Sequence, residues 1–253
     1  MRIEGDGAIK ITLAATKTCS SITDSDIGSA FIGTGHYVYT ADYVTNSSGA
    51  TSSSKKTIAD YVNGKAQNTS SMRYKLEAWL TSSGIDTSKL KEDNWCLGNT
   101  IDPYDNSGTL VTNTVNDLMY NSTSFYYDTY VRLYGRGQTA NSTLKCDGKN
   151  YKTYKSYIGA LTADEAVFAG GKASTSNTNY YLTNNATSYY WRTLSPSLFN
   201  GIDDFTSVVS DTGKVTHTYE YHGGFSLRPE VSLASGTVIT GGNGTQTNPY
   251  VVD

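Results

Sequence analysis

The chain has 253 residues, enough for one large β-rich domain or two small ones with a sizeable core. Its net charge is only −3 and no basic stripe is visible, so the electrostatic footprint of a nucleic-acid-binding protein is missing. Charged residues make up 17% of the chain, below the usual quarter, and Ser, Thr, Asn and 21 Tyr take their place. This composition favours an extracellular protein with an adaptable binding surface.

The first expected element is a hairpin over residues 2–13, because Gly5-Asp6-Gly7 separates alternating apolar residues. Since the chain opens almost directly in this strand, we expect an export signal or anchor to lie upstream in the intact gene. No apolar run approaches the ~20 residues that cross a bilayer. Residues 16–54 are rich in Ser, Thr and Gly and are expected to be mostly loop, with a brief strand at 37–39.

Apolar residues recur at spacings of three and four between residues 54 and 80, which predicts two short amphipathic helices. The first is centred on Ile58, Tyr61 and Val62. The second carries a stripe of four apolar residues: Met72, Leu76, Trp79 and Leu80. A stripe of this kind is usually core, so we assign it to the fold and not to a cofactor site.

Residues 94–157 form a long polar insertion without strong periodicity, which is a liability in a compact domain unless it is cross-linked. A disulfide between Cys96 and Cys146 would close a loop of about fifty residues and stabilise the fold by roughly 4 kcal/mol. Two unrelated buried thiols are the alternative. A zinc site is less favoured than either, because the chain has no Cys-x-x-Cys motif and only three His. Cys19 is left without an assigned partner.

Residues 158–171 predict a strand and then a short helix, because Thr162 and Glu165 match a capping box and Gly170-Gly171 closes the segment. Beyond this helix the pattern is strand and turn throughout. The expected strands lie at 189–193, 205–210, 215–221, 227–233, 237–240 and 250–252.

Short motifs follow one another in a definite order along the second half of the chain: Leu161-Thr162-Ala163-Asp164-Glu165, Tyr190-Trp191, Leu194-Ser195-Pro196, Leu227-Arg228-Pro229, Thr240-Gly241-Gly242 and Asn248-Pro249-Tyr250. In this order they resemble the C-type-lectin-fold modules of secreted, pilin-like and surface proteins of Gram-positive and gut bacteria, which are related to the formylglycine-generating-enzyme fold. Trp95-Cys96 and Lys145-Cys146 resemble a cysteine pair of that family's variable insertion. The resemblance implies one α+β domain over residues 1–253, with mostly antiparallel short strands, two or three short helices, long loops and a polar insertion at 94–157.

The same fold carries the variable proteins of diversity-generating retroelements, in which a strand pair displays ligand contacts on a rigid scaffold. By resemblance, the chain would be a target protein of such a system. The alternation along residues 205–210 agrees in part with this set of contacts. Phe205, Ser207 and Val209 share one face of the strand, which we take as core, and the residues between them lie on the other face, which we expect to be displayed. The ligand-binding residues that the resemblance implies are Thr193, Phe199, Asn200, Asp203, Asp204, Thr206, Val208, Ser210, His217, Tyr219, Tyr221 and His222.

No catalytic constellation can be assembled, so we do not expect an enzyme. His217 and His222 lie near acidic residues in the sequence, which is compatible with a metal or acid–base site. The alternation of His217 with Tyr219 and Tyr221 instead favours a solvated strand. The formylglycine-generating enzymes use active-site cysteines, and no cysteine lies beyond Cys146.

A calcium site is the remaining metal alternative, at Asp203, Asp204 and Asn200. An acidic surface loop is the preferred interpretation, because lectin-type calcium sites carry more carboxylates and amides in close register. We therefore predict neither a metal site nor a cofactor.

Together these features predict a non-enzymatic, extracellular or cell-surface binding domain. It would act as an adhesin or receptor-recognition module whose partner is a protein or glycan on another cell or host surface. Tyr219, Tyr221 and Phe199 would supply apolar contact area at low entropic cost. The alternative is a structural, pilin-like or surface-assembly subunit that lacks its N-terminal anchor.

Overall fold

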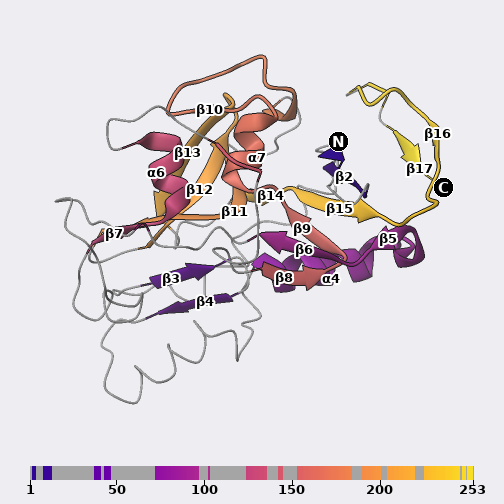
Figure 1. Ribbon diagram of the computed structural model, residues 1–253, viewed down its shortest axis with the longest axis horizontal. Helices are drawn as coiled ribbons and strands as arrows, with labels where there is room; N and C mark the ends of the chain where they lie inside the picture. Colours follow the sequence, from indigo (N-terminus) through magenta and orange to yellow (C-terminus); the bar gives the residue numbers. More distant parts are fainter. Residues whose placement is uncertain are drawn as a thin grey trace.

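The computed structural model describes residues 2–3, 8–12, 37–40, 43–46, 72–96, 102, 124–135, 142–144, 153–183, 190–200, 204–219, 225–245, 247–248 and 250–252. These residues form an α+β structure, mostly short strands with a few short helices, as expected from the sequence (Figure 1). None of the helices among them is both long and apolar enough to pass through a bilayer. Two larger sheets carry the fold.

The first sheet is antiparallel and runs in the order β1-β2-β15-β5, with β9 also paired to β15. Strands β1 and β2 pair Arg2 with Lys10, which confirms the expected hairpin. Helix α4 (Met72–Ser83) contacts β9, and its Leu76, Trp79 and Leu80 are buried in the core of this sheet, as the apolar stripe predicts. The strands are β1 (Arg2–Ile3), β2 (Ile9–Thr12), β5 (Leu90–Lys91), β9 (Ile158–Ala160) and β15 (Pro229–Leu233).

The second sheet runs in the order β10-β13-β12-β11-β14, with β7 also paired to β11. Its pairs are antiparallel except β10 with β13 and β11 with β14. Helices α6 (Asp128–Tyr134) and α7 (Ala163–Phe168) contact it, and Trp191, Val209 and Val215 share a core with them. The strands are β7 (Phe125–Tyr126), β10 (Lys172–Ala173), β11 (Tyr190–Phe199), β12 (Asp204–Ser210), β13 (Lys214–Tyr219) and β14 (Ser226–Leu227).

Helix α7 begins with the capping box that the sequence predicts. The Glu165 amide donates to Thr162 Oγ1 at 3.2 Å, and the Thr162 amide donates back to Glu165 Oε2 at 2.7 Å. Two backbone donors that the first turn of a helix leaves unpaired are thereby satisfied.

The two sheets meet where the chain passes from β14 into β15. Leu194 of β11 and Leu227 of β14 are buried in the core of the first sheet, so the sheets share apolar side chains. Between β14 and β15, the buried Arg228 donates to the Leu182 carbonyl at 2.6 Å and lies over the Trp191 ring at 5.1 Å. This guanidinium ties the junction to the second core.

The polar insertion is more regular than expected. Its base is closed by an antiparallel pair in which the buried rings of Trp95 and Tyr154 lie opposite each other. Apolar side chains at these two positions favour pairing over loop. The strands are β6 (Asp93–Cys96) and β8 (Thr153–Ser156), and β7 and α6 also lie inside the insertion.

Smaller elements complete the described chain. The strand expected at 37–39 is present as β3 (Tyr37–Thr40), but it pairs with β4 (Tyr43–Asn46) in a stretch that we expected to be loop. The helix expected around Ile58 lies outside the described residues. The remaining elements are β16 (Ile239–Gly241), β17 (Val251–Val252) and the 3-10 turns η2 (Thr87–Lys89) and η3 (Tyr181–Thr183).

Candidate functional site

The register of strands β12 and β13 decides which way the expected binding residues point. Phe205 pairs directly with Tyr219, and Ser207 pairs directly with His217. Directly opposed residues of antiparallel strands have their side chains on the same face. His217 and Tyr219 therefore lie on the face that we took as core, and the alternate residues of β12 point to the opposite side. The single displayed face expected from the sequence is divided between two sides of the sheet.

The expected contacts on β11 and β12 are buried, so the prediction that they are displayed is wrong. Strand β12 lies between β11 and β13, and both α7 and β3 contact β11 and β12. Their polar groups bond internally, for example Thr193 Oγ1, which donates to the Ser207 carbonyl at 2.9 Å. The five buried residues, with exposed fractions from 0% to 6%, are Thr193, Phe199, Thr206, Val208 and Ser210.

The other expected contacts are divided. Asn200 is exposed immediately after β11, and the backbone of Asp204 begins β12. Asp203, Tyr221 and His222 lie outside the described residues, so their roles stay predictions.

A cluster of aromatic rings lies where helix α6 meets strands β12 and β13. Tyr126 and Tyr130 stack with ring centroids 4.6 Å apart and planes inclined by 17°. The ring centroid of Tyr134 lies 5.0 Å from that of Tyr130. The centroid of the His217 ring lies 5.4 to 5.7 Å from those of Tyr130, Tyr134 and Phe205. The ring centroids of Phe205 and Tyr219 lie 4.4 Å apart. All six side chains are half-buried. We call these residues the tyrosine–histidine cluster: Tyr126, Tyr130, Tyr134, Phe205, His217 and Tyr219.

Helix α6 supplies the tyrosine side of this cluster for local reasons. Asp128 in its first turn and Arg132 in its last turn complement the helix dipole. Gly135 ends the helix with a φ of 68°, a conformation that favours glycine. Spacings of four residues place Tyr130 and Tyr134 on one side of the helix, in line with the preceding Tyr126.

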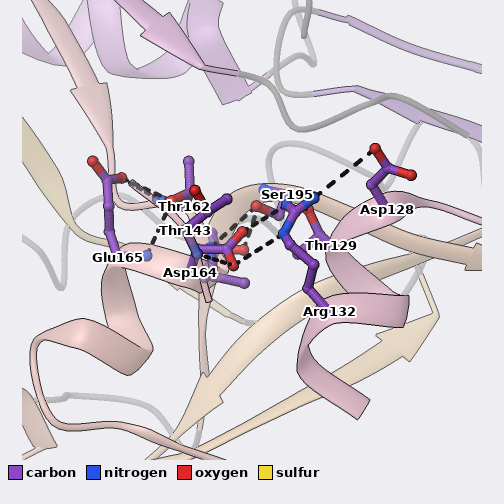
Figure 2. A network of polar contacts seen from close by, with 10 residues as sticks. Asp128, Thr129, Arg132, Thr143, Thr162, Asp164, Glu165 and Ser195 are labelled. Carbon is purple, nitrogen blue, oxygen red and sulfur yellow. Dashed lines mark hydrogen bonds and ion pairs between the residues drawn. The ribbon is translucent and has the colours of Figure 1, made fainter. Parts of the chain in front are cut away.

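An ion pair fixes this helix against the second core (Figure 2). Arg132 Nη2 donates to Asp164 Oδ2 at 2.8 Å, and Arg132 Nε donates to Oδ1 at 3.3 Å. The Thr143 amide donates to the same carboxylate at 3.1 Å, and the Asp164 side chain is only 5% exposed. The neighbouring Ala163 amide donates to Ser195 Oγ at 3.1 Å. Helix α6 is thus joined to α7, and α7 to strand β11.

Burial disfavours charge on the titratable groups of the cluster. It lowers the pKa of His217, and the charge of Lys214 lowers it further. It raises the pKa of Tyr130 and Tyr134, with smaller contributions from neighbouring acidic groups. Beside the cluster, burial raises the pKa of Asp128 against the opposing effect of Arg132. The cluster can therefore make aromatic contacts and hydrogen bonds between uncharged groups.

Cys96, at the end of β6, is disulfide-bonded. Its partner lies outside the described residues, so the pairing with Cys146 stays a prediction. A covalent link at this point anchors the insertion where β6 and β8 close it.

Within the described ranges, no three or more His, Cys, Asp or Glu side chains gather as ligands for a metal ion. The calcium alternative depends on Asp203, which is outside those ranges.

No protein-family model, curated protein or solved structure matches the chain at a significant level. The site is therefore interpreted from its own geometry.

Sequence reasoning missed the helical half of the site. Tyr126, Tyr130 and Tyr134 follow one another at intervals of four residues, which is a helical signal. The sequence instead predicts a long polar insertion without strong periodicity over residues 94–157, which contains all three. His217 and Tyr219 were selected, but as residues of a solvated strand and not as partners of a tyrosine helix.

Proposed function

We propose that the protein is a non-enzymatic, extracellular binding protein that recognises a protein or glycan on another surface through the tyrosine–histidine cluster. The observation that supports this most is the gathering of six half-buried rings from helix α6 and strands β7, β12 and β13. Tyrosine offers a large amphipathic contact area and few rotatable bonds. Because packing already restrains the rings, a partner would find them ordered and lose little entropy on binding.

We also propose that the scaffold is C-type-lectin-like. The ordered motifs of the second half support this, together with an α+β structure of mostly antiparallel short strands. If the protein belongs to a diversity-generating retroelement, a template repeat and a reverse transcriptase gene should lie beside its own gene. Their absence from that locus would contradict this part of the proposal.

The binding proposal is tested with the labelled full chain on arrays of glycans and of cell-surface proteins. Tyr130→Ser and Tyr219→Ser should each weaken the strongest interaction at least tenfold, which corresponds to about 1.4 kcal/mol. Tyr181→Ser is the matched control, because Tyr181 is 40% exposed and lies outside the cluster. Thermal melting verifies that each variant is folded. Equal binding by all variants, or no binding by the parent chain, would overturn the proposal.

A surface-assembly role is the second candidate, and the C-terminal hairpin favours it. Val238 and Val251 are 58% and 52% exposed, beside or within strands β16 and β17. Among the described strands these two pair only with each other, so they leave edges and apolar side chains for another copy of the chain. Sedimentation should then show association that Val238→Ser and Val251→Ser together abolish. A monomer at all concentrations would argue against assembly.

A further inference from the structure

A cavity of about 310 Å³ lies between helix α7 and the paired strands β2 and β15 of the first sheet. We call it the α7 cavity. Phe168 and Ala169 lie three and four residues after Glu165, so all three line it from one side of the helix. Thr12 and Glu230 are directly paired across β2 and β15 and line it from the sheet. The cavity thus joins the two sheets' neighbouring elements at the surface.

The α7 cavity has a buried base and an apolar mouth. Glu230 and Leu161 are only 3% and 5% exposed, which places them at the base. Leu144 and Phe168 are 44% and 57% exposed, which places them at the mouth. Exposed apolar side chains that meet beside a hollow mark a surface that a partner can cover.

The charge of the lining favours a cation. Glu165 and Glu230 both contribute a carboxylate, and in the described part of the chain no basic residue is among the lining residues. The Arg132 guanidinium is turned toward Asp164, on the side of the polar network away from Glu165 (Figure 2). A cation that enters the cavity would make charge-assisted hydrogen bonds to these carboxylates, and its charge would offset the cost of burying Glu230.

We propose that the α7 cavity binds the side chain of a lysine on a protein partner. The methylene stem of the lysine would pack against Leu144, Leu161 and Phe168. Its ammonium group has three donors, and the oxygens of Thr12, Glu165 and Glu230 are the acceptors that line the cavity. The flat, five-donor fork of arginine suits this narrow arrangement less well.

Two observations favour a protein over a free amine as the source of the lysine. The volume lies near the lower limit of about 300 Å³ for small-molecule pockets, which suits a single side chain. Leu144 and Phe168 would stay in water around a free amine, whereas the residues that flank a lysine in a protein would cover them. The α7 cavity is separate from the tyrosine–histidine cluster, so this inference goes beyond the proposed function and does not depend on it.

The test measures the binding of labelled peptides to the full chain by fluorescence anisotropy. The reference peptide has one lysine between two leucines, and matched peptides carry norleucine, Nε-acetyl-lysine or arginine in place of the lysine. The lysine peptide should bind with a Kd on the order of 0.1–1 mM. The norleucine and acetyl-lysine peptides should bind at least about tenfold more weakly, because they keep the apolar stem and lose the charge. n-Butylammonium should also bind at least about tenfold more weakly than the lysine peptide, because it leaves the mouth uncovered.

Substitutions in the protein test the mouth and the base separately. Phe168→Ser and Leu144→Ser should each weaken binding of the lysine peptide at least about threefold. Val238→Ser is the matched control, because Val238 is 58% exposed and does not line the cavity. Glu230→Gln should remove the preference for the lysine peptide over the norleucine peptide, and thermal melting verifies that this variant is folded. If it is not, the acetyl-lysine peptide still tests the need for charge on the parent chain.

The inference is overturned if no peptide binds, if the lysine and norleucine peptides bind equally, or if Phe168→Ser and Leu144→Ser bind as tightly as the parent. Tighter binding of the arginine peptide would overturn the choice of lysine. Equal binding of n-butylammonium would overturn the choice of a protein partner. Tyr219→Ser should leave peptide binding unchanged, so a failure of the α7 cavity and a failure of the tyrosine–histidine cluster are distinguishable.

Discussion

Replacing Arg132 with methionine tests whether one ion pair holds helix α6, and with it half of the aromatic cluster. The guanidinium bonds both carboxylate oxygens of Asp164, and the two side chains are 18% and 5% exposed. Removing one partner of a buried pair leaves the other charge uncompensated and costs about 3–5 kcal/mol. Because Arg132 keeps some contact with solvent and the Thr143 amide still donates to Asp164, we expect a value at the lower end, about 3 kcal/mol.

Urea unfolding and thermal melting, both without reductant, measure this cost. In a domain of this size 1 kcal/mol shifts the Tm by about 2–4 °C, so Arg132→Met should melt about 6–12 °C lower. The near-UV circular dichroism of the tyrosines should also fall, since α6 carries Tyr130 and Tyr134. Arg73→Met is the matched control. Its pair with Glu77, one helical turn away, is more exposed, at 27% and 34%, and should be worth less than about 1 kcal/mol.

Adding Asp164→Asn to Arg132→Met sharpens the test. The second substitution removes the charge that the first one strands, so the double variant should be less destabilised than the sum of the two single variants. The reasoning is refuted if the two costs add, or if Arg132→Met and Arg73→Met lower the Tm equally.

Three further predictions concern the core, the site and a helix cap. Gly159→Ala should cost about 2–3 kcal/mol in urea unfolding, because the added Cβ would overlap the buried Trp95 ring. Gly241→Ala is the control and should cost less than about 1 kcal/mol, because a Cβ at Gly241 meets no crowded neighbour. Equal costs would contradict this prediction. Burial holds the pKa of His217 in the folded chain below 6.5, so on acidification the unfolded chain takes up the proton first. The stability that neutral His217 contributes is therefore fully present above pH 6.5 and is lost as the pH falls through the pKa of the folded state. Between about pH 7.5 and 5 the parent should therefore lose more stability than His217→Phe, and parallel profiles would refute the effect. Thr162→Ala should cost about 1 kcal/mol through loss of the helix cap, and an unchanged unfolding midpoint would show that the cap contributes nothing.

Elements determined by neighbouring residues could be predicted from the sequence. The capping box of α7 needs only Thr162 and Glu165, three positions apart, and the first hairpin needs only its glycine turn between alternating residues. The stripe on α4 was also predictable, because a helical repeat of apolar residues has to be buried against something. In each case the physical cause lies within about a dozen consecutive residues.

The candidate site depends on partners that are distant in sequence. Alternation along β12 correctly placed Val209 in the core, but it does not reveal that the opposite face is covered as well. Thr206 and Val208 are small and uncharged, which suits either a displayed face or a packed one. The face of His217 follows from its pairing with Ser207, and that register is a property of the folded hairpin.

The position of the aromatic cluster has a consequence for how stability and binding are related. Helix α6 spans only Asp128–Tyr134, and a helix of this length is not stable alone in water, so tertiary contacts must hold it. Those contacts include the buried Leu133 in the second core, the Arg132–Asp164 ion pair and the aromatic contacts with His217. A partner that packs on the tyrosines therefore also binds the state in which the ion pair is formed. Binding should raise the melting temperature of the parent more than that of Arg132→Met, because in the variant part of the binding energy goes into reordering α6.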